Sequence, residues 1–210
     1  MFKTIKQSFL LLCIAMLAFA VNAADFTDGK HYQTIENDKS ETPKVTEFFS
    51  FYCPHCYQFE PIAMALEESL PKGAEFEKSH VNFLQGLPAQ VQSNLSYAYI
   101  IAQQAGKEQQ VTAQIFDSIH QKKAELSDIK DVKKLLELNG ISEKDFDQSM
   151  SSMLVIAAEQ KMQEQQELFG KLGALSGVPT FIVNDKYKIN MREVKSQADL
   201  EALVKYLLAK

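Results

Sequence analysis

The chain has 210 residues, of which 22 are Lys or Arg and 27 are Asp or Glu, so that its net charge at pH 7 is −5. This acidic balance argues against nucleic acid as a partner, because phosphate binding requires clusters of basic side chains. The length suits one domain, or one domain with an insertion, behind a short leader.

The leader is predicted at residues 1–23, MFKTIKQSFLLLCIAMLAFAVNA, which have the pattern of a secretory signal peptide. Lys3 and Lys6 precede an apolar run of about a dozen residues, shorter than the roughly 20 that span a membrane. We expect cleavage after Ala23, which also removes Cys13. The mature chain then carries 20 basic and 27 acidic residues, a net charge of −7. It is expected to be soluble in a compartment where disulfides persist.

A βαβ unit is predicted in the first part of the mature chain. The stretch KVTEFFSFY, residues 44–52, is rich in β-branched and aromatic residues and favours a buried strand. Apolar residues then recur at helical spacing until Pro71 and Gly73 end the helix. EFEKSHVNF, residues 75–83, favours a second strand. A strand, a helix and a strand with short connections predict two parallel neighbours.

The middle of the chain shows only helical patterns. The expected helices fall at 93–106, 107–121, 127–140, 141–150 and 152–169. Ser127 and Ser142 are the predicted N-caps of the third and fourth helices, and Gly140 is the predicted stop of the third.

Strands return near the C-terminus, at 180–183 and 186–190. They are joined across Asn184 and Asp185, a pair suited to a tight hairpin turn. A last helix is predicted after Ser196 as its N-cap. The sequence therefore predicts a small α/β domain that is split by an all-helical insertion.

The motif CPHC, residues 53–56, holds both cysteines of the expected mature chain. A structural disulfide across two residues would restrict the unfolded chain very little. A zinc site needs a second pair of ligands, and the histidines elsewhere are scattered singly. Two unrelated core thiols are not expected around a proline at a strand-to-helix turn. A redox-active pair accounts best for the motif, and no metal ion or cofactor is predicted.

Each residue of the motif has a role in such a pair. Cys53 would lie at the N-terminus of the helix, where unpaired N–H groups and the helix dipole favour a thiolate. The pKa of Cys53 should therefore fall. Pro54 suits the first helical position. His55 would further stabilise the thiolate, while Cys56 is expected to be buried. Stabilising the thiolate makes the disulfide a stronger oxidant.

The chain resembles the thioredoxin superfamily and, within it, the DsbA family of bacterial periplasmic thiol oxidases. The resemblance rests on FFSFYCPHCYQFE, on EKSHVNF, on GVPTFIVNDKY and on the helical block between the last two. It implies a periplasmic protein with a thioredoxin-like fold and an inserted all-helical domain. The expected bounds are 24–83 and 170–210 for the thioredoxin-like domain, and 84–169 for the insertion.

The resemblance also assigns roles to residues. Cys53 would be the exposed nucleophile and Cys56 the resolving cysteine. Pro179 would follow a cis peptide bond in a loop beside the disulfide, where Val178 and Pro179 contact substrate peptides.

Two charged residues in the strands are a further expectation. By burial habits alone, Glu47 and Lys78 would more often lie on a solvated face. The resemblance instead implies a buried or semi-buried charge pair beneath the disulfide, with Glu47 handling the proton of Cys56. His80 also matches, but a packed strand histidine is the favoured interpretation.

The function implied is a protein dithiol:disulfide oxidoreductase that introduces disulfide bonds into reduced secreted or periplasmic proteins. A membrane quinone-linked thiol oxidase of the DsbB type would reoxidise it, and a monomer is expected. An isomerase on this fold is disfavoured, since only about 20 residues separate Ala23 from the first strand, too few for a dimerisation domain. A chaperone or peptide-binding module would keep its activity without Cys53, whereas an oxidase would lose it.

Overall fold

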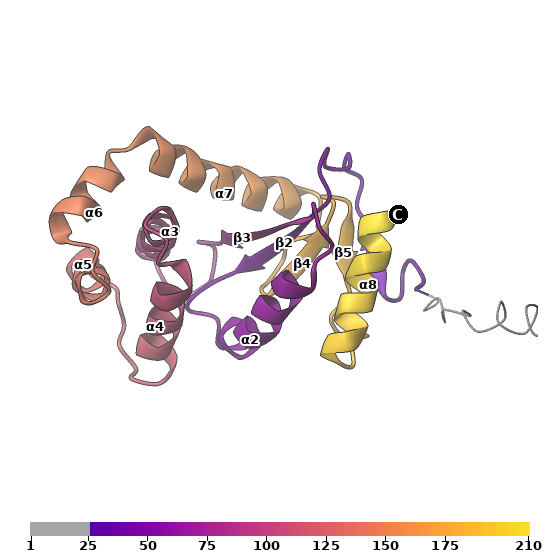
Figure 1. The fold of residues 1–210 in the computed structure, drawn as a ribbon, viewed down its shortest axis with the longest axis horizontal. Helices are drawn as coiled ribbons and strands as arrows, with labels where there is room; N and C mark the ends of the chain where they lie inside the picture. The colour runs from indigo at the N-terminus through magenta and orange to yellow at the C-terminus, as the bar shows by residue number, and fades with distance from the viewer. Residues whose placement is uncertain (1–25) are drawn as a thin grey trace, which may run out of the picture.

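The computed structural model describes residues 26–210 and contains a mixed sheet with helices on both faces (Figure 1). The strand order is β1-β5-β4-β2-β3. The strands are β1 (Tyr32–Thr34), β2 (Lys44–Phe49), β3 (Glu75–His80), β4 (Thr180–Val183) and β5 (Tyr187–Ile189). The predicted signal peptide lies outside the described residues. In the part of the chain from residue 26 onward, no helix is both long and apolar enough to cross a membrane.

The centre of the sheet is the predicted βαβ unit. β2 and β3 are parallel, with Glu47 opposite Lys78, and helix α2 (Pro54–Ser69) connects them. β4 joins the other side of β2 in the antiparallel sense. The predicted hairpin between β4 and β5 is confirmed, because Asn184 and Asp185 adopt φ values of 51° and 55°, as tight turns require.

The remaining helices form two groups. Five of them follow one another between β3 and β4: α3 (Ala89–Gln104), α4 (Glu108–His120), α5 (Ile129–Leu138), α6 (Glu143–Met150) and α7 (Met153–Lys171). In Figure 1 they extend to one side of the sheet, and α7 returns along the top to reach it. The last helix, α8 (Gln197–Ala209), packs beside α2 and β4.

Local sequence signals set most of the helix starts. The predicted N-caps Ser142 and Ser196 are confirmed, since each hydroxyl accepts a hydrogen bond from the backbone N–H three residues on. The prediction for Ser127 is wrong by one residue: Asp128 is the N-cap of α5, and its carboxylate accepts from Lys130 N–H. Both residue types can cap, so the choice depended on where the helical backbone begins.

Strand β1 was not predicted. It has three residues, of which only Tyr32 is buried, and it pairs antiparallel with β5 at the edge of the sheet. An element this short shows too few alternations for a strand pattern.

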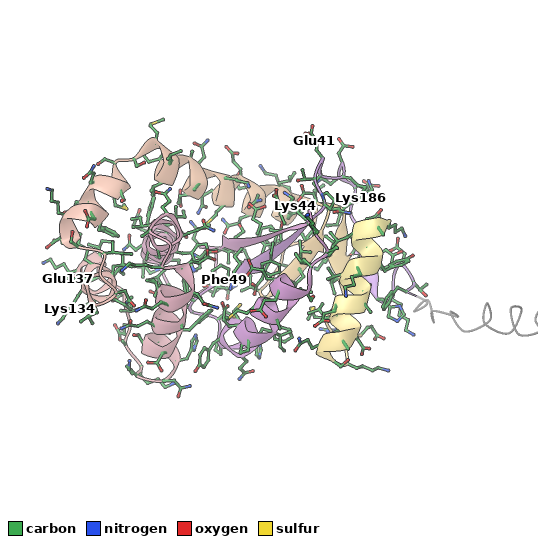
Figure 2. The ribbon with its side chains drawn as sticks, in the orientation of Figure 1. Glu41, Lys44, Phe49, Lys134, Glu137 and Lys186 are labelled. Carbon is green, nitrogen blue, oxygen red and sulfur yellow. The ribbon has the colours of Figure 1, made fainter. Side chains whose placement is uncertain are left out.

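Apolar side chains fill both faces of the sheet, and on the face toward α7 they include Phe48, Phe169 and Ile182. One cluster lies between the sheet and helices α2 and α8, and includes Phe181 and Leu203. A second joins the end of β2 to helices α3, α4 and α5, with Phe49 in its interior (Figure 2). In the same view, Lys134 and Glu137 lie on the outer side of α5. Because the second cluster also contains both cysteines of the motif, the helical block packs directly against them.

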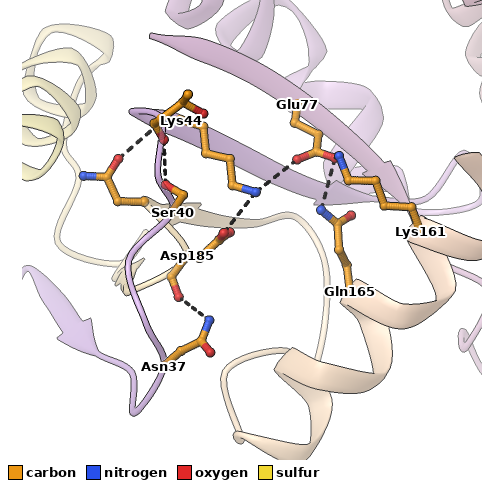
Figure 3. Close-up of polar contacts among 9 residues, drawn as sticks. Asn37, Ser40, Lys44, Glu77, Lys161, Gln165 and Asp185 are labelled. Atoms are coloured by element: carbon orange, nitrogen blue, oxygen red, sulfur yellow. Dashed lines mark hydrogen bonds and ion pairs between the residues drawn. The ribbon is translucent and has the colours of Figure 1, made fainter.

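A network of charges fixes α7 against the sheet at the start of β2 (Figure 3). Glu77 on β3 pairs with Lys161 of α7 at 2.6 Å and accepts a hydrogen bond from Gln165 at 3.1 Å. Lys44 pairs with Glu77 at 3.5 Å and with Asp185 of the hairpin turn at 3.0 Å. These contacts hold the sheet end that lies farthest along β2 from the cysteines.

Candidate active site

The two cysteines lie where the chain passes from β2 into α2. Cys53 is the N-cap of α2, with φ −88° and ψ 115°, and its Sγ accepts a hydrogen bond from Cys56 N–H at 3.3 Å. Pro54 occupies the first turn, where a missing N–H costs nothing. Both cysteines are unpaired, so the structure shows the reduced site.

Cys53 is less open than the resemblance implies. Its exposed fraction is 7%, and that of Cys56 is 0%. The carbonyl oxygen of Val178 lies 3.4 Å from Cys53 Sγ and covers one side of it. A substrate thiol must therefore approach along the groove beside that loop.

The electrostatics divide the roles of the two sulfurs. The side chain of Cys56, as a hydrogen-bond donor, contributes most to lowering the pKa of Cys53, which falls from 9.0 to about 6. Burial opposes this shift, while the backbone N–H groups of Cys56 and His55 and the charge of His55 support it. The same hydrogen bond, together with burial, raises the pKa of Cys56. At neutral pH the reduced site thus holds a thiolate at Cys53 and a thiol at Cys56.

The predicted proline loop adjoins Cys53. The Val178–Pro179 peptide bond is cis, as the resemblance implies. Thr180 Oγ1 donates to Gly177 O at 2.7 Å across the loop. Val178, Pro179 and His55 line a cavity of about 1060 Å³ that continues over β1 and β5. This cavity is large enough to take several residues of an extended peptide.

Three charged side chains lie beneath the cysteines. Glu47 is completely buried, and its Oε2 lies 3.4 Å from Lys78 Nζ. The ammonium group binds Glu60 more closely, at 2.5 and 2.7 Å. The interpretation that Glu47 and Lys78 lie on a solvated face is therefore wrong, because α2 and the helical block cover this end of β2 and β3. Glu60 was not predicted, although its position one turn after Cys56 on α2 is a usable signal.

The shared ammonium leaves Glu47 incompletely compensated. Neither Glu47 oxygen accepts a hydrogen bond from any residue of the described chain. Burial raises the pKa of Glu47 to about 7, although the charge of Lys78 opposes the shift. Burial alone would lower the pKa of Lys78, but Glu47 and Glu60 together raise it. Glu47 can consequently gain or lose a proton near neutral pH while Lys78 stays charged.

A solvent route reaches this charge cluster from the side. A cavity of about 340 Å³ opens between α2, β3 and the α3–α4 connection, and both Glu60 and Lys78 line it. Because Glu47 contributes to the raised pKa of Cys56, the two groups are electrostatically linked. The charge cluster is thus linked electrostatically to the buried thiol, and two of its members, Glu60 and Lys78, line a cavity.

Two histidines fix the backbone at Phe51, just before the motif. Phe51 N–H donates to His80 Nε2 at 3.2 Å, so His80 Nδ1 carries the proton and donates to Ser96 Oγ at 2.8 Å. Burial lowers the pKa of His80 to about 3, which keeps it neutral. His80 is thus a packed strand histidine, as favoured from the sequence.

The second histidine comes from the helical block. His120 Nε2 donates to Phe51 O at 2.8 Å, and its ring stacks on Tyr57 at 5.0 Å between centroids. His120 was not predicted to act here, because nothing in a single sequence links residues so far apart.

Comparisons with known proteins agree with this arrangement. A model of the family described as "DSBA-like thioredoxin domain" matches residues 44–207. The thiol:disulfide interchange protein DsbA of Yersinia pestis is 37% identical over 190 residues, which cover 88% of this chain and 86% of that protein. The DsbA of Dickeya dadantii is 35% identical over 216 residues, covering 97% and 99%.

Solved structures give the same result. The crystal structure of DsbA from Klebsiella pneumoniae has a TM-score of 0.79 and 27% identity, and covers 90% of this chain and 100% of that one. A cysteine-to-serine variant of Proteus mirabilis DsbA, in complex with the non-covalently bound peptide PWATCDS, has a TM-score of 0.78 and 26% identity, covering 89% and 100%. The α/β fold with its helical insertion is therefore thioredoxin-like.

Proposed function

This chain belongs to the family of DSBA-like thioredoxin domains, and we propose that its thiol:disulfide oxidoreductase activity is carried by Cys53 and Cys56, acting on reduced proteins in the periplasm. The observation that carries the proposal is the asymmetry of the two sulfurs. The pKa of Cys53 is lowered to about 6 at a helix N-terminus, and the pKa of the buried Cys56 is raised. A stable thiolate is a good leaving group, so the disulfide form is an oxidant.

The reaction begins from the Cys53–Cys56 disulfide. A substrate thiolate attacks Cys53 Sγ, a substrate–Cys53 bond forms, and Cys56 leaves as a thiolate. The second thiolate of the substrate then attacks its own sulfur in this mixed disulfide and expels Cys53 as a thiolate. The substrate loses two electrons and gains a disulfide, while the protein gains two electrons and becomes the dithiol.

Glu47 supplies the proton that this sequence requires. Cys56 leaves into a buried environment that disfavours its thiolate, and it must be protonated there. With a pKa of about 7, Glu47 can give that proton and recover it from water past Glu60 and Lys78. Lys78 holds the carboxyl in place, and its positive charge keeps the pKa of Glu47 from rising further.

The proposal extends to organisation and partners. Residues 24–83 and 170–210 would form the thioredoxin-like domain, with 84–169 inserted, since α3 to α7 lie between β3 and β4. Val178 and Pro179 would contact the substrate peptide as an added strand. The reduced protein would pass its electrons to a membrane quinone-linked thiol oxidase of the DsbB type. We propose that it acts as a monomer.

A single-turnover experiment tests the redox pair. The oxidised protein is mixed with a reduced peptide that contains two cysteines, and the reaction is quenched with acid and an alkylating agent. Mass spectrometry should find the peptide disulfide and the dithiol protein in equal amounts. Cys53→Ser should give no peptide disulfide. Cys56→Ser, loaded beforehand as a mixed disulfide between Cys53 and the peptide, should give no further peptide disulfide once that mixed disulfide has been converted. Oxidation that persists in Cys53→Ser would show that Cys53 does not carry the reaction, whereas a wild-type protein that binds the peptide and never oxidises it would be a binding module.

A further inference from the structure

The cavity beside Cys53 has an unbalanced positive charge. Lys30, Lys188 and Arg192 line it, with His55 at the end near the motif. Among the described residues of its lining, none is Asp or Glu. This contrasts with the whole chain, in which acidic residues outnumber basic ones by 27 to 22. The local excess of cations is therefore not a consequence of overall composition.

Lys188 is the half-buried cation of this group, whereas Lys30 and Arg192 are exposed. It lies in β5 between Tyr187 and Ile189, which are buried on the face covered by α2 and α8. Because side chains alternate along a strand, Lys188 points to the opposite face. There it stands between Gln33 of β1 and Ile182 of β4, its partners in the sheet.

The ammonium group of Lys188 has no counter-charge. It makes no ion pair or hydrogen bond within the part of the chain that the structure describes, and its side chain is half-buried. Burial lowers the pKa of Lys188. The side chains of Lys30 and Arg192 are likewise unpaired there and lie exposed at the cavity rim. A partly dehydrated cation without a partner is unfavourable, and a bound carboxylate would relieve it.

We propose that this cavity selects reduced substrates in which an Asp or Glu side chain lies within a few residues of the cysteine that attacks Cys53, and that Lys188 is the specificity-determining residue. The inference rests on the proposed function and adds to it the substrate class. The exchange chemistry is unchanged: the acidic side chain strengthens docking, and the thiolate of the substrate attacks Cys53 as before. Lys30 and Arg192 raise the rate of encounter with acidic segments.

A binding experiment isolates this preference from the chemistry. The chain has no Trp, so the fluorescence of a peptide Trp reports binding without background. The probe is the peptide PWATCDS, in which an aspartate follows the cysteine. Its neutral reference is PWATCNS. Further peptides are built from this reference, and each carries a single aspartate at a different position before or after the cysteine. All are titrated against Cys53→Ser protein, which cannot form the mixed disulfide.

We expect at least one aspartate position to bind about fivefold more tightly than PWATCNS, the effect of one partly exposed ion pair. Adding Lys188→Gln should reduce this ratio to about one, whereas Lys188→Arg should keep it. Lys205→Gln, which removes an exposed charge of α8 outside the cavity, is the matched control and should change nothing. Arg192→Gln should lower the ratio by less, and circular dichroism verifies the fold of each variant.

Different results would contradict the acidic selectivity and the proposed function. Equal affinities for all peptides, or a preference that survives in Lys188→Gln, would overturn the acidic selectivity. Oxidation of two-cysteine peptides by the wild-type protein decides the function separately. If it oxidises acidic and neutral peptides at equal rates, the function stands and the selectivity is wrong. If it oxidises neither, the proposed function fails.

Discussion

Replacing Glu47 with Gln should change the free energy of unfolding more favourably above pH 7 than near pH 4.5. The carboxyl is completely buried, and burial raises its pKa from 4.5 to about 7. The folded state therefore holds a proton that the unfolded state releases between these two values. The stability from this group is fully present below about pH 4.5 and is lost as the pH rises through 7. At 1.36 kcal/mol for each pKa unit, the loss is about 3 kcal/mol.

The assay is urea unfolding of the reduced proteins at several pH values from 4.5 to 8. The difference in unfolding free energy between Glu47→Gln and wild type should grow by about 3 kcal/mol over this range, or roughly 6–12 °C in Tm. Both proteins carry Cys53→Ser, because the charge of Cys53 contributes to the pKa of Glu47 and its titration would not cancel. Glu41→Gln, at an exposed carboxylate before β2, is the control and should give a constant difference. A constant difference for Glu47→Gln as well would refute a raised pKa.

Further changes around the cysteines have expected outcomes. Absorbance at 240 nm should give Cys53 a pKa of about 6, and His55→Ala should raise it only slightly, because the neighbouring thiol and amide donors remain. A return to about 9 would mean that the imidazole dominates. Lys78→Met should cost about 3 kcal/mol in urea unfolding at pH 8, since two carboxylates lose their shared cation; an unchanged midpoint would contradict the ion-pair geometry. His120→Ala should cost about 1 kcal/mol and slow single-turnover oxidation by loosening Phe51, and a normal rate would show that this contact does not position the motif.

Local signals explain what could be predicted from the sequence. The position of Cys53 as N-cap followed from a strand pattern, a proline at the first helical position and a helical repeat, all within a few residues. The hairpin at Asn184 followed in the same way from turn chemistry. The cis bond before Pro179 and the charge pair of Glu47 and Lys78 came from the resemblance, since no local pattern indicates them.

The remaining features depend on packing between distant segments. Glu60 and Lys78 meet only because α2 crosses over β3. His120 reaches the motif because α4 packs against α2, which no periodicity in either helix reveals. Lys188 reads as an ordinary alternating strand residue, and its exposure to the cavity depends on which part of the sheet the helices leave uncovered. The roles of these residues could be identified only once the fold was known.

The central claim is that the lowered pKa of Cys53 makes its disulfide an oxidant. At pH 7, a pKa of about 6 in place of 9.0 stabilises the dithiol by about 1.4 kcal/mol, which raises the reduction potential by about 30 mV. Equilibration of the protein with glutathione redox buffers at pH 7, followed by alkylation and mass spectrometry, measures that potential directly. We predict a midpoint potential at or above about −270 mV, which is about 30 mV above the roughly −300 mV of structural disulfides, while a Cys53–Cys56 disulfide that persists below about −300 mV would contradict the account.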